Sequence, residues 1–313
     1  MTAVLALLVG TFLLGLHGHR PLLWLADRRV DPTIALTGWV LSAVAVLAST
    51  LATLAVFAAL PADDHHPSGI FGLAGDCWTA LSSGAAPAWR EVAASVSVLA
   101  AGVILARLTW AVFYRWILRR QRRPYLAQLR LLAAGTPSGE PLWVREDRPL
   151  ALSIGGQPGL IVMSDALRRG LTPAAVRAAL EHERAHLRGR HHLLVAVVET
   201  LAAALPACPL LRAAPAAVKD LVELAADAGA ARRCGAAAVR EALCGVTGQA
   251  SPAFGLAMAG RLTQARLMRL AVGSVGATTA VRLAGSAAMA LVALALPAAT
   301  GAAAAHVLAC ALT

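Results

Sequence analysis

Four apolar blocks with few or no charged side chains divide this chain of 313 residues. They predict membrane helices at about 2–17, 34–60, 92–114 and 283–313, because a helix needs about 20 apolar residues to cross a bilayer. The third block contains one charge, Arg107, near its end, and the last contains Pro297. The first block is short, but no basic residue precedes it, so it fits a retained membrane helix better than a signal peptide.

The stretch between the third and fourth blocks, 117–282, is more polar and predicts a separate domain. Thr172 and Pro173 suit the N-cap and the first position of a helix that runs to about Arg190. A basic stretch, Arg115–Leu132, is interrupted by Pro124 and is expected to lie along the inner membrane surface. The other expected elements are strands at Leu142–Val144, Leu150–Ile154 and Leu160–Met163 with a turn at Gly155–Gly159, an apolar helix at 193–211, and a helix from near Pro215.

The predicted fold class is therefore mainly α: a polytopic membrane protein with four membrane helices and an α+β domain that carries a small β-hairpin. The positions of the arginines orient this arrangement. Seven arginines lie between 107 and 130 and four more precede the last block, whereas 61–91 holds only Arg90 and the C-terminal tail holds none. Since loops rich in Lys and Arg stay in the cytoplasm, we expect the 117–282 domain inside the plasma membrane and both termini outside.

Composition agrees with a membrane protein. The chain is 58% hydrophobic and 14% charged, its mean hydropathy is +0.66, and its net charge is +11. The arginines flank apolar blocks, so the lipid bilayer explains them better than nucleic acid, and we expect no nucleic-acid partner. The five cysteines form no CxxC pair, which argues against a cysteine zinc site.

One motif carries chemistry. His182 and His186 are four residues apart on the predicted helix, so both rings project from one face and can bind one metal ion. Glu183 lies beside the first histidine, where a carboxylate can take a proton from a water that a zinc ion has activated. This HExxH pattern is typical of zinc peptidases. His191 and His192 lie off this face and are interpreted as a polar helix end.

A catalytic zinc ion needs a third protein ligand, and Glu223 is the best candidate. Asp227 lies four residues later, on the same helical face, and could accept a hydrogen bond from a ligating histidine, most simply His182. Without the HExxH motif this pair would be interpreted as a solvated surface. The chain between His186 and Glu223 must then cross the membrane zero times or twice, so 193–211 is expected to return to the side from which it left.

These motifs resemble the membrane metallopeptidases of family fifty-six, the group of β-lactam-sensing antirepressor proteases, which is related to HtpX-like and prenyl-protein peptidases. The resemblance covers about 140–245 and rests on Leu180–Arg190 and Glu223–Asp227. It implies a gluzincin-like zinc endopeptidase whose substrate is a protein or peptide, such as a transcriptional repressor or a membrane protein. It also implies that the substrate pairs with an edge strand, here Leu160, Ile161, Val162 and Met163.

The chain departs from the antibiotic sensors in one respect, because it ends at Thr313, directly after the last predicted membrane helix. We therefore expect no penicillin-binding sensor domain. Two other functions stay open at this point: a non-catalytic membrane receptor or scaffold with a structural metal site, and a membrane quality-control or prenyl-protein protease.

Overall fold

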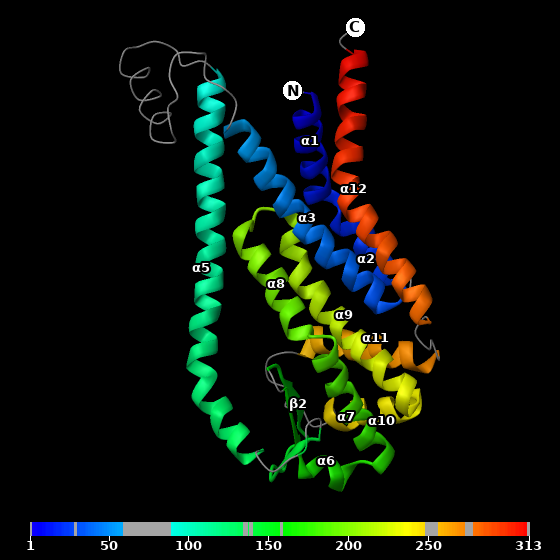
Figure 1. The fold of residues 1–313 in the computed structure, drawn as a ribbon. Helices are drawn as coiled ribbons and strands as arrows, with labels where there is room; N and C mark the ends of the chain where they lie inside the picture. The colour runs from blue at the N-terminus through cyan, green and yellow to red at the C-terminus, as the bar shows by residue number, and fades with distance from the viewer. Residues whose placement is uncertain are drawn as a thin grey trace.

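The computed structural model describes residues 2–27, 30–58, 89–133, 137, 140–156, 159–247, 256–272 and 278–311. As predicted, the protein is mainly helical (83%) and has one small mixed sheet of three strands (Figure 1). Two helices are long and apolar enough to cross a membrane, at Pro32–Ala58 and Val92–Leu132. The described apolar parts of the first and last helices, Leu8–His17 and Thr279–Ala293, are shorter.

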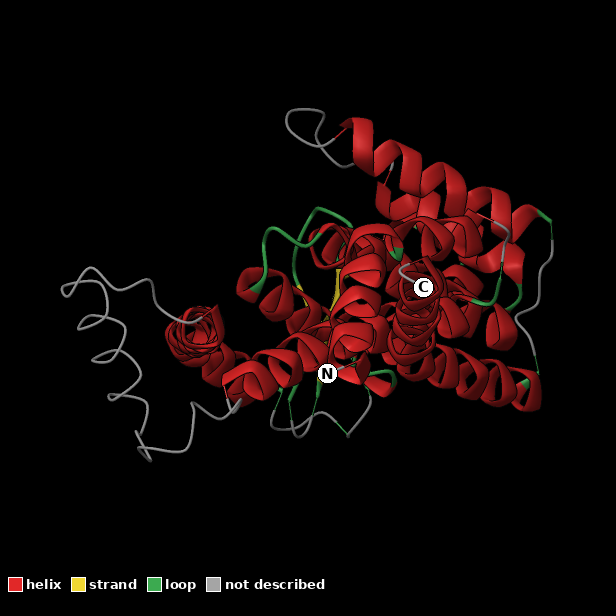
Figure 2. Cartoon of the chain, turned by 90° about the horizontal axis from the view of Figure 1, so that it is seen from above, coloured by secondary structure: helices red, strands yellow, loops and turns green. Residues whose placement is uncertain are grey.

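The first, third and last helices form one packed group. α1 (Thr2–His17), α3 (Pro32–Ala58) and α12 (Thr279–Ala311) contact one another, and α2 (His19–Asp27) packs beneath them on α3. Both chain ends lie at one end of the molecule, together with the end of α3 and the beginning of α5 (Trp89–Leu132), as Figures 1 and 2 show. The sheet lies at the opposite end (Figure 1).

The structure corrects the expected break at Pro124. α5 is a single helix of 44 residues that passes through Pro124, and its lower end turns toward the sheet (Figure 1). A proline removes one helical hydrogen bond and leaves the carbonyl of residue i−4 without its partner. That carbonyl belongs to Arg120, which is exposed, so water can satisfy it and the helix continues. The expected domain boundary at 116/117 therefore lies inside a helix.

The expected helix start near Pro215 is also wrong. α9 begins at Pro209 and runs to Cys234, with Pro215 inside it. Pro209 occupies the first helical turn, where its fixed φ favours the helix and its missing N–H costs nothing. The next turns bury Leu210, Leu211 and Ala214 completely, and this packing outweighs the one hydrogen bond that Pro215 removes.

α8 (His191–Ala204) and α9 form a helical hairpin that is inserted among the apolar helices. Val198, Leu210 and Val218 share one core with Trp39 of α3, and all four are fully buried. Near the tip of the hairpin, Cys208 Sγ lies 3.5 Å from the backbone oxygen of Gly15 in α1. The chain thus leaves the domain at α8 and returns to it along α9, as the metal-site hypothesis requires.

The sheet contains β1 (Leu142–Val144), β2 (Ala151–Ile154) and β3 (Leu160–Ser164) in the order β1-β3-β2. The hairpin prediction is confirmed, because β2 and β3 pair antiparallel, while β1 pairs with β3 in parallel. The prediction of Leu160–Met163 as an edge strand is wrong. β3 is hydrogen-bonded on both sides, and Ile161, Val162 and Met163 are buried.

A second core joins the sheet to the remaining helices. Met163 and the fully buried Leu167 of α6 (Asp165–Gly170) pack against small residues of α7 (Pro173–Arg188) and α9. α10 (Ala236–Thr247) and α11 (Leu256–Ala271) complete this core. β2 lies directly beside α7, so the free edge of the sheet that faces the motif helix is β2.

Candidate metal centre

The motif helix begins where its sequence predicts. Thr172 Oγ1 accepts a hydrogen bond from the backbone N–H of Ala175 at 3.2 Å, and Pro173 follows as the first helical residue. Glu241 of α10 accepts two further hydrogen bonds, from the backbone N–H and the hydroxyl of Thr172, both at 2.9 Å. The helix therefore has a fixed start, and its register places His182 and His186 on one face.

α9 lies close against α7 because small residues meet at the contact. A Cβ atom on Gly229 would come within 3.2 Å of the Cβ of Ala185. This close approach brings Glu223 to the two imidazoles. Glu223 Oε2 lies 3.5 Å from His182 Nε2, Glu223 Oε1 lies 3.5 Å from His186 Nε2, and the two Nε2 atoms are 3.0 Å apart.

These three distances fit a single ion. A tetrahedral zinc with metal–ligand bonds of about 2.0–2.2 Å separates its donor atoms by about 3.3 Å. His182, His186 and Glu223 together are a group that could hold a metal ion, as the sequence predicted. Two imidazoles and one carboxylate with a free fourth position are the donor set of catalytic zinc sites. Among the described residues, no fourth ligating side chain joins the group.

Asp227 and Arg266 surround the donors. His182 Nδ1 lies 2.9 Å from Asp227 Oδ1, which fixes the tautomer that leaves Nε2 free for a metal. Arg266 of α11 donates to both oxygens of Asp227, at 2.6 and 2.8 Å, and lies 3.1 Å from Glu223. From the sequence, Arg266 is one of four arginines that precede the last apolar block, and nothing in its local pattern distinguishes it from Arg261 or Arg269.

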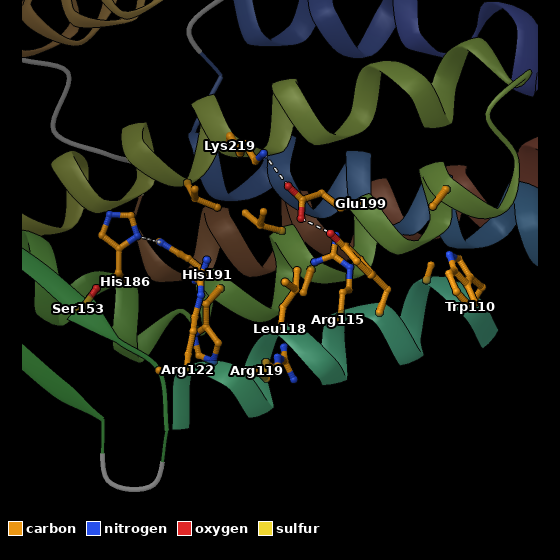
Figure 3. A pocket seen from close by; sticks show the side chains of 18 of the residues that line it. Trp110, Arg115, Leu118, Arg119, Arg122, Ser153, His186, His191, Glu199 and Lys219 are labelled. Atoms are coloured by element: carbon orange, nitrogen blue, oxygen red, sulfur yellow. Dashed lines mark hydrogen bonds and ion pairs between the residues drawn. The ribbon is translucent and has the colours of Figure 1, made fainter. Parts of the chain in front are cut away.

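His191 belongs to the site, which corrects its interpretation as a polar helix end. α7 ends at Arg188 with Gly189 as its C-cap, and Arg190 adopts a left-handed conformation with φ 48°, so α8 begins in a new direction. The ring of His191 then folds back over Gly189, which has no Cβ to obstruct it, and its Nδ1 lies 3.0 Å from His186 Nδ1 (Figure 3). The helical spacing that places His191 off the ligand face applies only if α7 continues to His191, and α7 ends before it.

The charges of the site follow from these contacts. Burial lowers the pKa of His182, but hydrogen bonds to Asp227 and Glu223 outweigh it and raise the pKa to about 9. Burial lowers the pKa of His186 to about 4, and the neighbouring His182 acts in the same direction. Burial also raises the pKa of Glu183, whereas Arg266 and His182 hold the pKa of Asp227 below its ordinary value despite burial.

Glu183 lies at the wall of the site nearest to β2. It is buried, and its carboxylate interacts with Ser153 of β2. Two cavities meet here, and both are lined by Ser153, His186 and Glu223. The smaller, of about 380 Å³, extends toward apolar residues of α10, and the larger, of about 1360 Å³, extends along α5. All three metal donors therefore line the smaller cavity, and His186 and Glu223 also line the larger one.

Comparison of the chain with protein-family models, curated proteins and solved structures gives no match. The chemistry of the site therefore has to be argued from its geometry. The structure brings together His182, His186, Glu223 and Asp227, with Glu183 beside them, and adds His191 and Arg266. It places Leu160–Met163 in the middle of the sheet instead of at the edge that faces the site.

Proposed function

We propose that this protein is an integral membrane, zinc-dependent endopeptidase that hydrolyses a peptide bond in a protein substrate. The observation that carries the proposal is the triangle of His182, His186 and Glu223, whose edges of 3.0 to 3.5 Å match one tetrahedral ion. A structural zinc site would need a fourth protein ligand. Here two cavities reach the donor atoms instead, which favours a site that admits water and substrate.

Each neighbouring residue has a role in this proposal. A bound zinc ion would polarise the scissile carbonyl and lower the pKa of a water molecule. Glu183 takes the proton from the attacking water and returns it to the leaving amine, and its raised pKa suits both transfers. Asp227 holds the tautomer and orientation of His182, and Arg266 keeps Asp227 and Glu223 ionised and in place.

We propose β2 as the strand on which the substrate lies. β2 pairs with β3 on one side only and lies beside α7, so an extended polypeptide can add to its free edge. Ala151, Leu152 and Ser153 of this strand line the smaller cavity together with Glu183. The substrate backbone would thereby be held next to the metal donors and the general base.

We further propose that α1, α3, α5 and α12 cross the plasma membrane, with the termini outside and the metal centre in the cytoplasm. Two of these helices are long and apolar enough to span a bilayer, and α1 and α12 pack along α3. The excess of arginines at the end that holds the sheet supports this orientation.

The test compares wild-type protein with Glu183→Gln. The substitution leaves the three ligands unchanged, so we expect one zinc ion per chain in both proteins by elemental analysis. It removes the proton acceptor, so membranes that contain the wild-type protein should accumulate new peptide N-termini that membranes with Glu183→Gln lack. Glu146→Gln, on an exposed carboxylate outside the site, is the matched control and should retain cleavage.

Two outcomes would contradict the proposal. Loss of zinc from Glu183→Gln would mean that this carboxylate is a ligand and not the base. Bound zinc without any new N-termini in the wild-type sample would favour the receptor or scaffold function, in which the metal serves stability alone.

A further inference from the structure

A large cleft connects the candidate metal centre with the face of α5 that is turned toward α8. It has a volume of about 1360 Å³, and Figure 3 shows Ser153, His186 and His191 at one end and Trp110 of α5 at the other. α5 forms one wall, and α8 and α9 form the other. A chain that lies along this cleft reaches two of the three metal donors, His186 and Glu223.

The described lining of this cleft is positively charged. It contains five cationic side chains, Arg107, Arg115, Arg119, Arg122 and Lys219, and three carboxylates, Glu199, Asp220 and Glu223. Glu199 is shared by two of the cations, since Arg115 and Lys219 each lie 2.6 Å from it (Figure 3). Glu223 is paired with Arg266 and belongs to the metal centre.

The third carboxylate, Asp220, forms no ion pair with Arg119 or Arg122. Among the described residues these two arginines have no carboxylate partner, and both are exposed in the cleft. Arg115, Arg119 and Arg122 follow each other at helical spacing and form one stripe that faces α8. Membrane orientation needs arginines at this level of α5 but does not need them on a particular face. Arg120 and Arg123 serve that purpose equally well and do not line the cleft, and Arg120 stacks on Trp116 at 5.2 Å.

We propose that this cleft holds the substrate polypeptide on one side of the scissile bond, and that it selects an acidic segment. The inference rests on the proposed peptidase function. Carboxylates of the substrate would pair with Arg119 and Arg122 close to the metal centre. The same stripe would repel a segment rich in Lys or Arg. Because most membrane proteins have basic cytoplasmic flanks, the cleft would exclude these flanks as substrates.

A binding experiment tests this directly. The full-length Glu183→Gln protein, loaded with zinc, is placed in nanodiscs of neutral phosphatidylcholine. Two fluorescent peptides are then titrated, one alternating alanine with glutamate and one alternating alanine with lysine. We expect the glutamate peptide to bind about fivefold more tightly or better, with a preference that weakens as salt is raised.

Charge reversal on the two faces of α5 provides the matched comparison. Arg119→Glu combined with Arg122→Glu should invert the preference, so that the lysine peptide binds more tightly. Arg120→Glu combined with Arg123→Glu makes the same change in net charge on the same helix and should leave the preference as it is. Equal effects of the two pairs, or equal binding of both peptides to the unreversed protein, would overturn the proposal.

Three further outcomes distinguish selection of acidic peptides from lipid binding by the stripe and from failure of the proposed peptidase function. If charge reversal in the cleft changes the retention of phosphatidylglycerol but not peptide binding, the stripe binds lipid headgroups and the proposal is wrong. If wild-type protein cleaves a mixed peptide library without preference for acidic sequences, the cleft inference alone fails. If the glutamate peptide binds as expected but no peptide is cleaved, the proposed peptidase function fails and the acidic binding site stands.

Discussion

The two histidines of the motif are oriented by different kinds of partner. His182 hydrogen-bonds to the carboxylate of Asp227, whereas Nδ1 of His186 faces the ring of His191 at 3.0 Å. For Nε2 of His186 to bind a cation, its Nδ1 must carry the proton and donate it to an acceptor. The unprotonated Nδ1 of His191 is that acceptor, and burial, which lowers the pKa of His191 to about 4, keeps the ring neutral.

This contact predicts the behaviour of two substitutions at residue 191. His191→Leu removes the acceptor and should weaken zinc binding about tenfold, since outer partners of ligating histidines contribute on this scale. His191→Asn keeps an oxygen near the position of Nδ1 and should retain most of the affinity. Competition with a chromogenic zinc chelator measures both, and His192→Leu, at the neighbouring position, serves as control. Equal affinity of the Leu and Asn variants would show that His191 only fills space.

The pKa of His182 predicts how zinc binding depends on pH. Because this pKa is raised to about 9, His182 is protonated in the metal-free protein at neutral pH and must lose that proton to bind zinc. Affinity should therefore rise about tenfold per pH unit from pH 6.5 to 8.5, with release of about one proton per ion. Asp227→Ala removes one of the two carboxylates that raise the pKa of His182, so this pKa should fall and the slope should flatten at the upper end of this range. Calorimetry in buffers of different ionisation enthalpy counts the released protons.

At this scale the sequence predicts the donors better than their surroundings. His182, His186 and Glu223 are recognisable because the chemistry of a metal site constrains residue type and helical spacing together. His191 and Arg266 carry no such pattern. His191 reaches the site through the left-handed Arg190, and Arg266 reaches it from α11, whose place against α9 depends on long-range packing. Neither the left-handed conformation of Arg190 nor the packing of α11 can be recognised from the local spacing of residues.

At the scale of elements, the start of α7 decides where the histidines point. Thr172 makes the cap and also joins α7 to Glu241 of α10. We expect Thr172→Ala to lower the free energy of unfolding by about 1–2 kcal/mol, because it removes a capping oxygen and one side-chain hydrogen bond. Thr172→Ser keeps the hydroxyl and should restore most of this loss. Thermal unfolding in detergent measures both, and an identical loss in the two variants would contradict the capping role.

The sequence predicts elements that depend on neighbouring residues better than elements that depend on contacts between distant parts of the chain. The cap at Thr172 and the uncharged run of α3 are local signals. The predicted turn at Gly155–Gly159 includes 157–158, which lie outside the described residues. The parallel pairing of β1 with β3 joins strands that the hairpin rule does not connect, and it turns β3 from an edge into the centre of the sheet. Pro124 predicts a break and Pro215 a helix start, but exposure in one case and tight packing in the other allow both helices to pass through these prolines.

At the scale of the whole molecule, the α8–α9 hairpin couples the membrane helices to the metal centre. One core runs from Trp39 of α3 to the residues of α9 on either side of Glu223, Val222 and Leu224. Glu199 and its two cations lie on the opposite side of this hairpin, toward α5. The hairpin that carries the third proposed ligand is thus held by α3 through this core and by α5 through the ion pair of Arg115 with Glu199.

The orientation of the molecule in the membrane is the last prediction. In a cysteine-free background, single substitutions Thr2→Cys, Ala58→Cys and Glu146→Cys report three positions. Thr2 begins α1 and Ala58 ends α3, and Glu146 lies in the chain between β1 and β2. Figure 1 shows the start of α1 and the end of α3 at the end that holds the termini, and the sheet at the other end. A membrane-impermeant maleimide should label Thr2→Cys and Ala58→Cys in intact cells, and should label Glu146→Cys only after permeabilisation.

The physical reason is the cost of moving arginine across a bilayer. Arg115, Arg119 and Arg122 lie at the same end of the molecule as Glu146, and arginines next to a membrane helix hold that end in the cytoplasm. Labelling of Glu146→Cys in intact cells would place the metal centre outside, where a cytoplasmic repressor could not reach it. Labelling of Ala58→Cys only after permeabilisation, with Thr2→Cys accessible, would mean that α3 does not cross. The α8–α9 hairpin, which positions Glu223, would then pack against a helix that does not span the membrane.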